Sequence, residues 1–252
     1  MQRILSPRNS RLLKKFALSN TLVAFDFDGT LAPIVRNRHR AAIRLSTRNL
    51  LAKLAALYPC VVISGRAQKD VQRRLLGIGI RRIVGNHGIE PWSTSPALEE
   101  AVRRWIPLLT DKLRQFGGVA IEDKRFSVAV HYRSELRKQE ARATIAAAAR
   151  KLGAVRLVNG KQVVNILPTG TPHKGLALKR EILKRGCTKA IYIGDDDTDE
   201  DVFALPDRGR LLTIRVGLNR SSLARYYIRS QSEIDRIIHK LIESRAESAM
   251  RP

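Results

Sequence analysis

Carboxylates stand directly beside apolar runs in this chain, in an arrangement that suits phosphoryl chemistry. Asp26 and Asp28 lie at and just past the end of the apolar run TLVAFDF, and six of the seven residues from Asp195 to Asp201 are acidic. Clustered carboxylate oxygens suit Mg²⁺, which takes one or two carboxylates together with waters and substrate phosphate. A carboxylate can also be the nucleophile that forms an aspartyl-phosphate.

Two further polar residues complete this pattern. Ser64 follows the apolar run CVVI, and Lys174 opens a helical pattern after LPTGTPH. A hydroxyl and an ammonium group can stabilise the charge on the oxygens of a transferring phosphoryl group. We therefore expect a divalent cation, with Lys174 and helix N-termini nearby, to stabilise the acidic cluster.

The acidic cluster has other interpretations when it is taken alone. It is compatible with a helix start, where carboxylates interact favourably with the helix dipole. An EF-hand calcium loop requires Gly at its sixth position and Glu at its twelfth. A loop that began at Asp195 would have Glu200 and Pro206 at those positions, which excludes this motif. The Asp26–Asp28 motif, Ser64, Lys174 and the acidic cluster are specific for phosphoryl chemistry only when all four occur together in this order.

The elements that must hold these residues alternate between strand and helix patterns. Apolar runs typical of buried strands cover 21–27, 60–64, 81–85, 190–194 and 211–217. Helical patterns cover 46–57, 67–76 and 174–186. This alternation predicts an α/β fold, with a parallel sheet that carries helices on both faces. In such sheets ligands bind at the carboxyl ends of the strands, where the polar residues lie.

The middle of the chain has a different pattern. A helical stretch over 97–116 precedes two strand patterns, VAIED and FSVAVHYR. An Ala-rich helix over 137–151 and strands at 154–158 and 162–167 follow. This β-β-α-β-β order predicts an inserted α+β domain over 93–166. The catalytic core would then consist of residues 1–92 and 167–252.

Composition limits the class of protein and its partners. The chain has 252 residues, of which 44% are hydrophobic, and no apolar run approaches the roughly 20 residues of a membrane span. The N-terminus lacks the apolar region of a secretory signal, so we expect a cytoplasmic protein without a membrane partner. The net charge is +24, but the basic residues are dispersed and aromatics are only 5%, so we do not expect a nucleic-acid partner. Nothing in the sequence indicates an oligomeric state.

The two cysteines lie far apart in the sequence. Cys60 and Cys187 each adjoin a predicted strand. In a cytosolic chain we expect buried free thiols, rather than a disulfide or a metal-binding pair.

The motifs together resemble a known group of enzymes. DFDGTLAPI, VVISGR, HKGLAL and IGDDDTDEDVF resemble the four motifs of haloacid dehalogenase (HAD) superfamily phosphatases. GNHGIE, EDK and HYR resemble the trehalose-6-phosphate phosphatase family in particular. The resemblance spans about residues 21–230 and implies a Rossmann-like HAD core with an inserted cap that closes over the sugar. It also implies Mg²⁺-dependent hydrolysis of a small-molecule sugar phosphate, trehalose 6-phosphate, through an aspartyl-phosphate.

The resemblance implies a role for each matched residue. Asp26 would be the nucleophile, Asp28 would protonate the leaving oxygen and then activate water, and Lys174 would contact the transferring phosphoryl group. Asp26, the Asp28 main-chain carbonyl and Asp195 would hold Mg²⁺, with Asp199 among or next to its ligands. The substrate-binding residues that the resemblance implies are Thr30, Ser64, Gly65, Arg66, Asn86, His87, Glu122, Lys124 and Arg133.

One departure from the family pattern concerns the sugar. Asn165 stands where the family commonly has a Glu that contacts the sugar, and the spacing from Pro168 to Lys174 is one residue longer. Two alternatives follow: a HAD phosphatase for another sugar phosphate, of the sucrose-phosphate or glycosylglycerate-phosphate type, or a non-enzymatic basic binding protein. The intact catalytic motifs argue against the second. The resemblance accounts neither for the first 20 residues nor for the positive charge.

Overall fold

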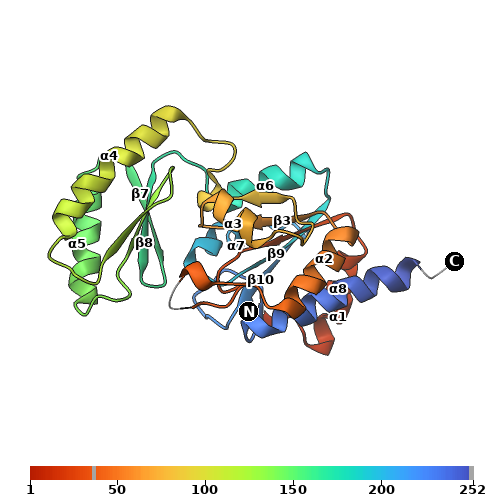
Figure 1. The fold of residues 1–252 in the computed structure, drawn as a ribbon. Coiled ribbons are helices and arrows are strands. Elements are labelled where there is room, and N and C mark those ends of the chain that lie inside the picture. The colour runs from red at the N-terminus through yellow and green to blue at the C-terminus, as the bar shows by residue number, and fades with distance from the viewer. Residues whose placement is uncertain (36–37, 250–252) are drawn as a thin grey trace.

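The computed structural model describes residues 1–35 and 38–249 and contains two sheets (Figure 1). Residues 36–37 and 250–252 of the expected core lie outside this description. The larger sheet has seven parallel strands in the order β1-β11-β10-β9-β2-β3-β4. In chain order its strands are β1 (Gln2–Arg3), β2 (Thr21–Phe25), β3 (Cys60–Ile63), β4 (Arg82–Val84), β9 (Lys189–Gly194), β10 (Leu211–Val216) and β11 (Tyr226–Ile228).

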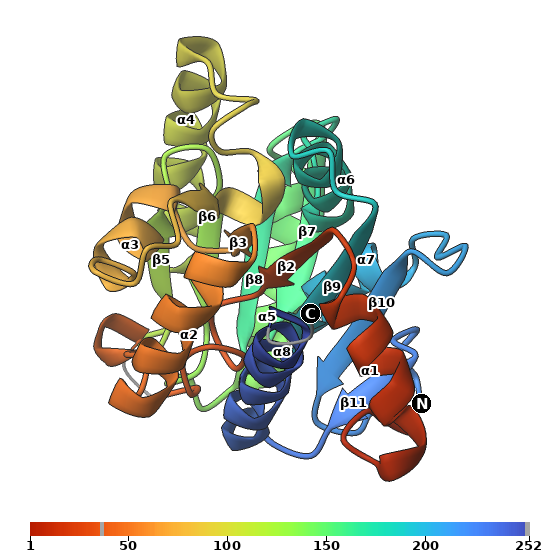
Figure 2. The same cartoon turned by 90° about the vertical axis from the view of Figure 1, so that its right-hand side faces the viewer.

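Helices cover both faces of the seven-stranded sheet because its buried strands alternate side chains between the two faces. Val23 and Phe25 share an apolar cluster with side chains of α1, α2, α3 and α8, whereas Leu22 and Ala24 pack with α6 and α7 (Figure 2). The predicted parallel sheet with helices on both faces is confirmed. These helices are α1 (Ser10–Ala17), α2 (Leu45–Leu57), α3 (Gln68–Arg74), α6 (Lys174–Lys184), α7 (Glu200–Phe203) and α8 (Ile234–Ala249).

The smaller sheet lies beside the larger one and is antiparallel (Figure 1). Its order is β5-β6-β8-β7, and two helices pack on it through an apolar cluster of its own. We call this part the cap; its elements are α4 (Pro96–Leu113), β5 (Ala120–Asp123), β6 (Val128–His131), α5 (Lys138–Arg150), β7 (Val155–Gly160) and β8 (Val163–Pro168). The element order matches the expected β-β-α-β-β insert, whose boundaries at 93 and 166 stay a prediction.

Both ends of the chain contribute elements that the sequence pattern did not reveal. The two-residue strand β1 pairs in parallel with β11, and α1 buries Leu13 and Phe16 in the core. The long helix α8 packs against α1 and α2. The first 20 residues therefore belong to the same domain as the seven-stranded sheet. The strand β1 has only two residues, which is too short to produce a recognisable alternation of apolar and polar residues.

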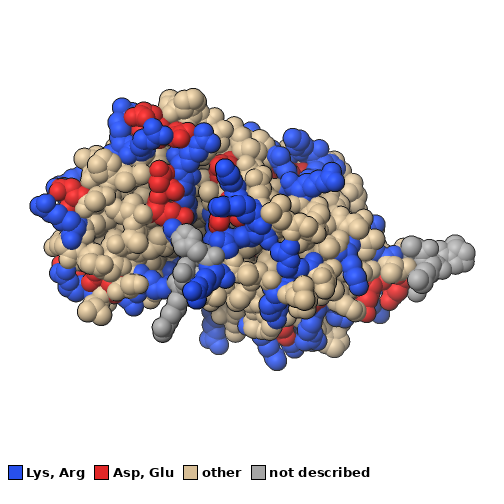
Figure 3. Space-filling model, viewed as in Figure 1, with Lys and Arg blue, Asp and Glu red and all other residues tan. Residues whose placement is uncertain are grey.

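Three sequence-level expectations on composition can be compared with the structure. In the part of the chain that the structure describes, no helix combines the length and the apolar character that crossing a bilayer requires. Cys60 and Cys187 are buried free thiols. On the face that Figure 3 shows, Lys and Arg side chains are distributed over the surface rather than gathered in one stripe.

Candidate active site

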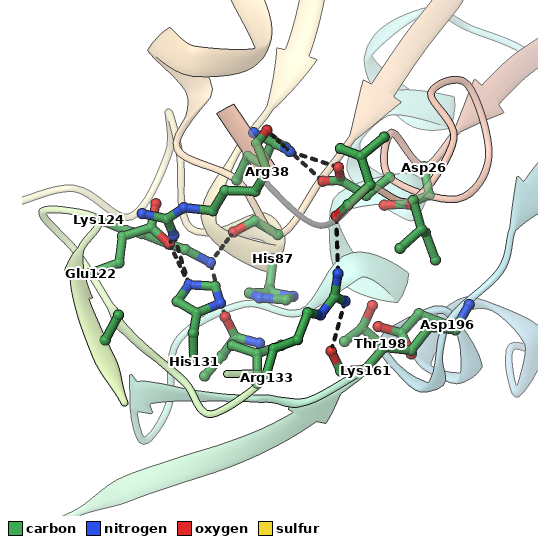
Figure 4. A pocket seen from close by; sticks show the side chains of 18 of the residues that line it. Asp26, Arg38, His87, Glu122, Lys124, His131, Arg133, Lys161, Asp196 and Thr198 are labelled. Carbon is green, nitrogen blue, oxygen red and sulfur yellow. Dashed lines mark hydrogen bonds and ion pairs between the residues drawn. The ribbon is translucent and has the colours of Figure 1, made fainter. Parts of the chain in front are cut away.

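The carboxyl ends of three neighbouring strands bring side chains from distant parts of the sequence together. Asp26 directly follows β2, Ser64 follows β3, and Asp195 follows β9. A cavity of about 520 Å³ opens at these strand ends and extends to the cap (Figure 4). The expected site residues in its wall are Asp26, Asp28, Gly65, Arg66, His87, Glu122, Lys124, Arg133, Lys174 and Asp195.

Three buried carboxylates form the centre of the acidic cluster. One oxygen from each of Asp26, Asp195 and Asp199 lies within 4.8 Å of the other two. Lys174 Nζ donates hydrogen bonds to Asp26 Oδ1 and Asp199 Oδ1, both at 2.7 Å. Lys174 therefore pairs with two of the carboxylates and Lys161 with Asp195, so three carboxylates face two ammonium groups. A divalent cation would supply the remaining positive charge.

The side chain of Asp199 is fully engaged by the protein. Its Oδ1 accepts from Lys174 and from the Tyr192 hydroxyl at 2.6 Å, and its Oδ2 accepts two main-chain N–H groups at 2.8 and 2.9 Å. A carboxylate offers about four lone-pair sites, so Asp199 has none left. Asp195 Oδ1 is buried and has no hydrogen-bond partner among the described residues. Asp26 and Asp195 therefore fit as cation ligands, and Asp199 positions Lys174.

The protonation of this cluster responds to burial and to like charges. Burial raises the pKa of Asp26, and the neighbouring Lys174 opposes this effect. Burial and Asp199 raise the pKa of Asp195 to about 7. Burial acts to lower the pKa of Lys174, but Asp199 and Asp26 hold it above its ordinary value. The ammonium group thus stays charged, and a divalent cation would favour the ionised form of both raised carboxyl groups.

Lys174→Met should lower the free energy of unfolding by about 3–5 kcal/mol, because removing one partner leaves buried charges uncompensated. Urea unfolding in the presence of EDTA measures this loss without a cation to replace the lysine. Lys179→Met, on the exposed face of the same helix, is the control and should change stability by about 0.5 kcal/mol or less. Equal stability of the two variants would contradict the assigned ion pairs.

A tight turn after β2 brings the second motif aspartate into the site. Gly29 has φ 79°, and a side chain at this position would collide with the Asp195 carboxylate. Only glycine meets both requirements without strain. Thr30 and Ser64 are buried behind the cavity wall; Thr30 Oγ1 has no partner among the described residues, and Ser64 Oγ accepts from Arg66 N at 3.1 Å.

Asp28 forms a bidentate ion pair with Arg66. Arg66 Nε lies 2.6 Å from Asp28 Oδ2, and Arg66 Nη2 lies 2.7 Å from Asp28 Oδ1. Arg66 also donates to Asp70 Oδ2 at 2.8 Å. Both carboxylate oxygens of Asp28 are held by Arg66 in this conformation. Asp28 therefore has to separate from Arg66 before it can exchange a proton with a substrate.

Asn86 and His87 both adopt left-handed backbone conformations, with φ 48° and 58°. The Asn86 side chain donates to Glu90 Oε2 and to the Lys124 carbonyl at 2.9 Å each, and accepts from Ser127 Oγ at 2.6 Å. It therefore joins the cap to the core and lies behind the cavity wall. The His87 ring lines the cavity, and burial lowers its pKa. A neutral His87 ring thus forms part of the cavity wall.

The expected sugar-contacting residues of the cap meet partners of two kinds. Glu122 Oε2 forms an ion pair with Arg38 Nη1 and lies 3.0 Å from His131 Nε2. Lys124 Nζ donates to the Gly65 carbonyl and to Asn165 Oδ1, both at 2.9 Å. The single carboxylate among these residues is therefore engaged by a core arginine, whereas the lysine meets neutral acceptors.

Arg133 also hydrogen-bonds to neutral oxygens, the carbonyls of Val35 at 2.9 Å and Lys161 at 3.3 Å. The strand pattern FSVAVHYR predicted a strand through Arg133, but β6 ends at His131, so Arg133 lies just beyond β6 as Lys124 lies just beyond β5. Both still line the cavity.

Three basic cavity residues were absent from the sequence-based site. Arg38 comes from a short 3-10 helix (Arg38–Arg40) after β2, His131 from β6, and Lys161 from the turn between β7 and β8. Lys161 Nζ lies 2.6 Å from Asp195 Oδ2, so the cap reaches the acidic cluster directly. The NGKQ turn between two predicted strands was a signal for Lys161. Arg38 had no such signal, because one short turn of helix follows no period.

Comparison with known proteins agrees with this geometry. The family model described as trehalose-phosphatase matches residues 24–222. The chain belongs to the trehalose-phosphatase family. A trehalose-phosphate phosphatase of Mycolicibacterium paratuberculosis is 37% identical over 202 residues, covering 72% of this chain and 50% of that protein. A probable trehalose-phosphate phosphatase D of Arabidopsis thaliana is 29% identical over 244 residues, covering 86% and 66% respectively.

Several solved structures have the same fold as this chain. A trehalose-6-phosphate phosphatase related protein is 23% identical with a TM-score of 0.72, covering 90% of this chain and 99% of that one. The C-terminal domain of the Candida albicans trehalose-6-phosphate phosphatase is 19% identical with a TM-score of 0.76, covering 93% and 97%. The chain spans about half to two thirds of the length of the curated relatives above.

Proposed function

We propose that this chain is a phosphomonoesterase that hydrolyses trehalose 6-phosphate to trehalose and inorganic phosphate. The observation that carries the proposal is the buried pair of Asp26 and Lys174, which lies at one end of a cavity whose other end is formed by the cap. A carboxylate held by an ammonium group in such a cavity suits attack on a phosphoryl group. The names of the relatives support trehalose 6-phosphate as the substrate.

The reaction would proceed in two steps on the residues of this chain. An Asp26 carboxylate oxygen attacks phosphorus, the bond from phosphorus to the sugar oxygen breaks, and Asp28 donates a proton to that oxygen. Asp28 then accepts a proton from water, which attacks the aspartyl-phosphate and releases inorganic phosphate with Asp26 regenerated. Lys174 stabilises negative charge on the phosphoryl oxygens throughout. Asp28 would have to separate from Arg66 to exchange a proton in either step.

The site also fits a divalent cation, which we propose to be Mg²⁺. Asp26 and Asp195 would hold it, together with the Asp28 main-chain carbonyl, and Asp199 would keep Lys174 in place. When bound, Mg²⁺ would neutralise charge on the phosphoryl oxygens. Oxygen ligands and a buried carboxylate excess are the features that support this choice.

Phosphate release over a panel of sugar phosphates in Mg²⁺ buffer tests the function. The proposal expects trehalose 6-phosphate to give the highest kcat/KM, above sucrose 6-phosphate and glucose 6-phosphate. Turnover of the whole panel at one low rate would contradict the substrate. Release from none of them, nor from an aryl phosphate, would instead support the alternative of a non-enzymatic binding protein. The cytoplasmic location expected from the sequence stays a prediction.

Glu122→Ala should lower kcat/KM for the preferred sugar phosphate by about 10- to 150-fold, the effect of losing one charged hydrogen bond. Its partner Arg38 would also lose the charge that holds it between core and cap. Hydrolysis of a small aryl phosphate should fall much less, because that substrate has no group that reaches the cap. Glu140→Ala, on the exposed surface of α5, is the matched control. Equal loss on both substrates would mean that Glu122 supports the fold or the chemistry rather than the choice of sugar.

A further inference from the structure

A lysine of the cap contacts one of the proposed cation ligands of the core. Lys161 Nζ donates a hydrogen bond to Asp195 Oδ2 at 2.6 Å, and Lys161 lines the cavity on the same side as Asp196 and Thr198 (Figure 4). Asp195 is buried, whereas the Lys161 side chain is 52% exposed. In the described part of the chain this is the one hydrogen bond of Nζ. Since an ammonium group has three N–H donors, two of them are available to a ligand in the cavity.

The turn that carries Lys161 is held on both of its sides. On the cap side, the Gln162 carbonyl accepts a hydrogen bond from Tyr132 N at 3.1 Å, and Gln162 has the left-handed φ of 64°. On the core side, a side chain at Gly160 would come within 3.1 Å of Asp196 Oδ2, so the turn lies against the acidic segment. The backbone of the turn is therefore fixed at the acidic cluster, and the long side chain of Lys161 extends from it into the cavity wall.

The two ammonium groups at the acidic cluster differ in their freedom to move. Lys174 is 1% exposed, and its Nζ bonds to two carboxylates, Asp26 and Asp199. Lys161 bonds to one carboxylate, that of Asp195, whose other oxygen is buried without a partner among the described residues. A cation bound to Asp195 would repel the ammonium group on the same carboxylate, because like charges oppose each other. Lys174 is held by two partners, whereas Lys161 is free to turn toward another anion.

We infer that Lys161 is a further phosphoryl-binding residue, supplied by the cap. Its ammonium group pairs with Asp195 before the cation and the substrate bind, and it binds an oxygen of the phosphoryl group afterwards. The phosphoryl group that Asp26 attacks would lie next to Asp195, because one oxygen of each carboxylate lies within 4.8 Å of the other. Its negative oxygens would be the new partners of the displaced ammonium group. The inference rests on the proposed phosphatase function and adds to Lys174 a second ammonium group at the phosphoryl oxygens.

Lys161→Met should change the affinities for a cation and for an anion in opposite directions. Mg²⁺ should bind about 3-fold more tightly, because a partly exposed ammonium group no longer opposes it. Inorganic phosphate, titrated in saturating Mg²⁺, should bind about 10-fold more weakly, because it loses a charged hydrogen bond. Isothermal titration calorimetry measures both affinities without turnover. Lys151→Met, at an exposed cap position outside the cavity wall, is the control and should change neither. Lys161→Arg keeps the charge and should bind Mg²⁺ like the wild type.

Two substrates separate a phosphoryl-binding residue from one that only joins the cap to the core. In Lys161→Met, kcat/KM should fall about 10-fold for trehalose 6-phosphate and for a small aryl phosphate alike, because both carry the phosphoryl group. A loss confined to the sugar phosphate, or an unchanged affinity for inorganic phosphate, overturns the inference. Weaker binding of Mg²⁺ also overturns it, since Lys161 would then support the cation site. Failure of the phosphatase proposal is distinct, because neither substrate would then be hydrolysed while the two titrations still decide the role of Lys161.

Discussion

Asp26→Asn should reduce phosphate release by at least about 1,000-fold, because an amide cannot attack phosphorus and the reaction would lose its nucleophile. The amide keeps the shape of the side chain, so substrate access should not change. The measurement is kcat under saturating substrate with Mg²⁺, on protein whose fold is verified by circular dichroism. Asp111→Asn, at an exposed position of α4, controls for the chemical change and should keep full activity.

The same variant has an expected stability that distinguishes a nucleophile from a structural carboxylate. Asp26 is one of three buried carboxylates, of which Lys174 pairs with Asp26 and Asp199, and its pKa is raised by burial. Removing its charge relieves repulsion, while Lys174 retains Asp199 at 2.7 Å. In EDTA, Asp26→Asn should therefore melt at the wild-type temperature or above it. An inactive variant that also melts at a much lower temperature would speak for a structural role, and a folded variant with near-normal turnover would refute the nucleophile.

Removal of divalent cations should abolish turnover. The buried acidic cluster carries an excess of negative charge, so dialysis against EDTA should lower activity by at least about 100-fold and Mg²⁺ should restore it. Ca²⁺ should restore little activity, because its larger and more flexible coordination misplaces the nucleophile and the phosphate. Full turnover after complete chelation would rule out the metal-dependent proposal.

Cation binding has a second readout that does not depend on turnover. Mg²⁺ at 100 times its dissociation constant should stabilise the fold by about 2.7 kcal/mol, measured by urea unfolding with and without the ion. The stabilisation should shrink in Asp195→Asn, which loses a ligand whose Oδ1 is buried without a partner among the described residues. The Asp111→Asn control should respond like the wild type. The same shift in both variants would place the cation somewhere other than the acidic cluster.

The central residues of most helices and strands could be predicted from the pattern of apolar residues in the sequence. Buried strands such as β2 and β9 are continuous apolar runs, and helix α6 begins at Lys174 as predicted. Because parallel strands align their carboxyl ends, the residues that follow each run had to meet at one edge of the sheet. Asp26, Lys174 and Asp195 therefore came together in the structure as the sequence indicated.

Only the tertiary structure shows which carboxylate of the acidic cluster is saturated with hydrogen bonds and which can bind a cation. All six acidic residues of the 195–201 segment look alike in the sequence, but only Asp199 has its oxygens saturated by Lys174, Tyr192 and two main-chain N–H groups. Those donors come from three separate elements. Hydrogen-bond saturation is a property of the assembled site, and no spacing of residue types expresses it.

The sequence by itself determined the fold class, the motif residues at the strand ends and the presence of an insert, because these follow from local periodicity and from the alignment of parallel strands. Only the tertiary structure decided what the cap end of the cavity contains. Arg38 meets Glu122, Lys124 meets Asn165, and Lys161 meets Asp195 across the junction of core and cap. The first and third of these pairs join loops or turns to distant elements, where side chains find partners through packing rather than through a period. The pairing of these side chains is therefore a consequence of how core and cap are joined.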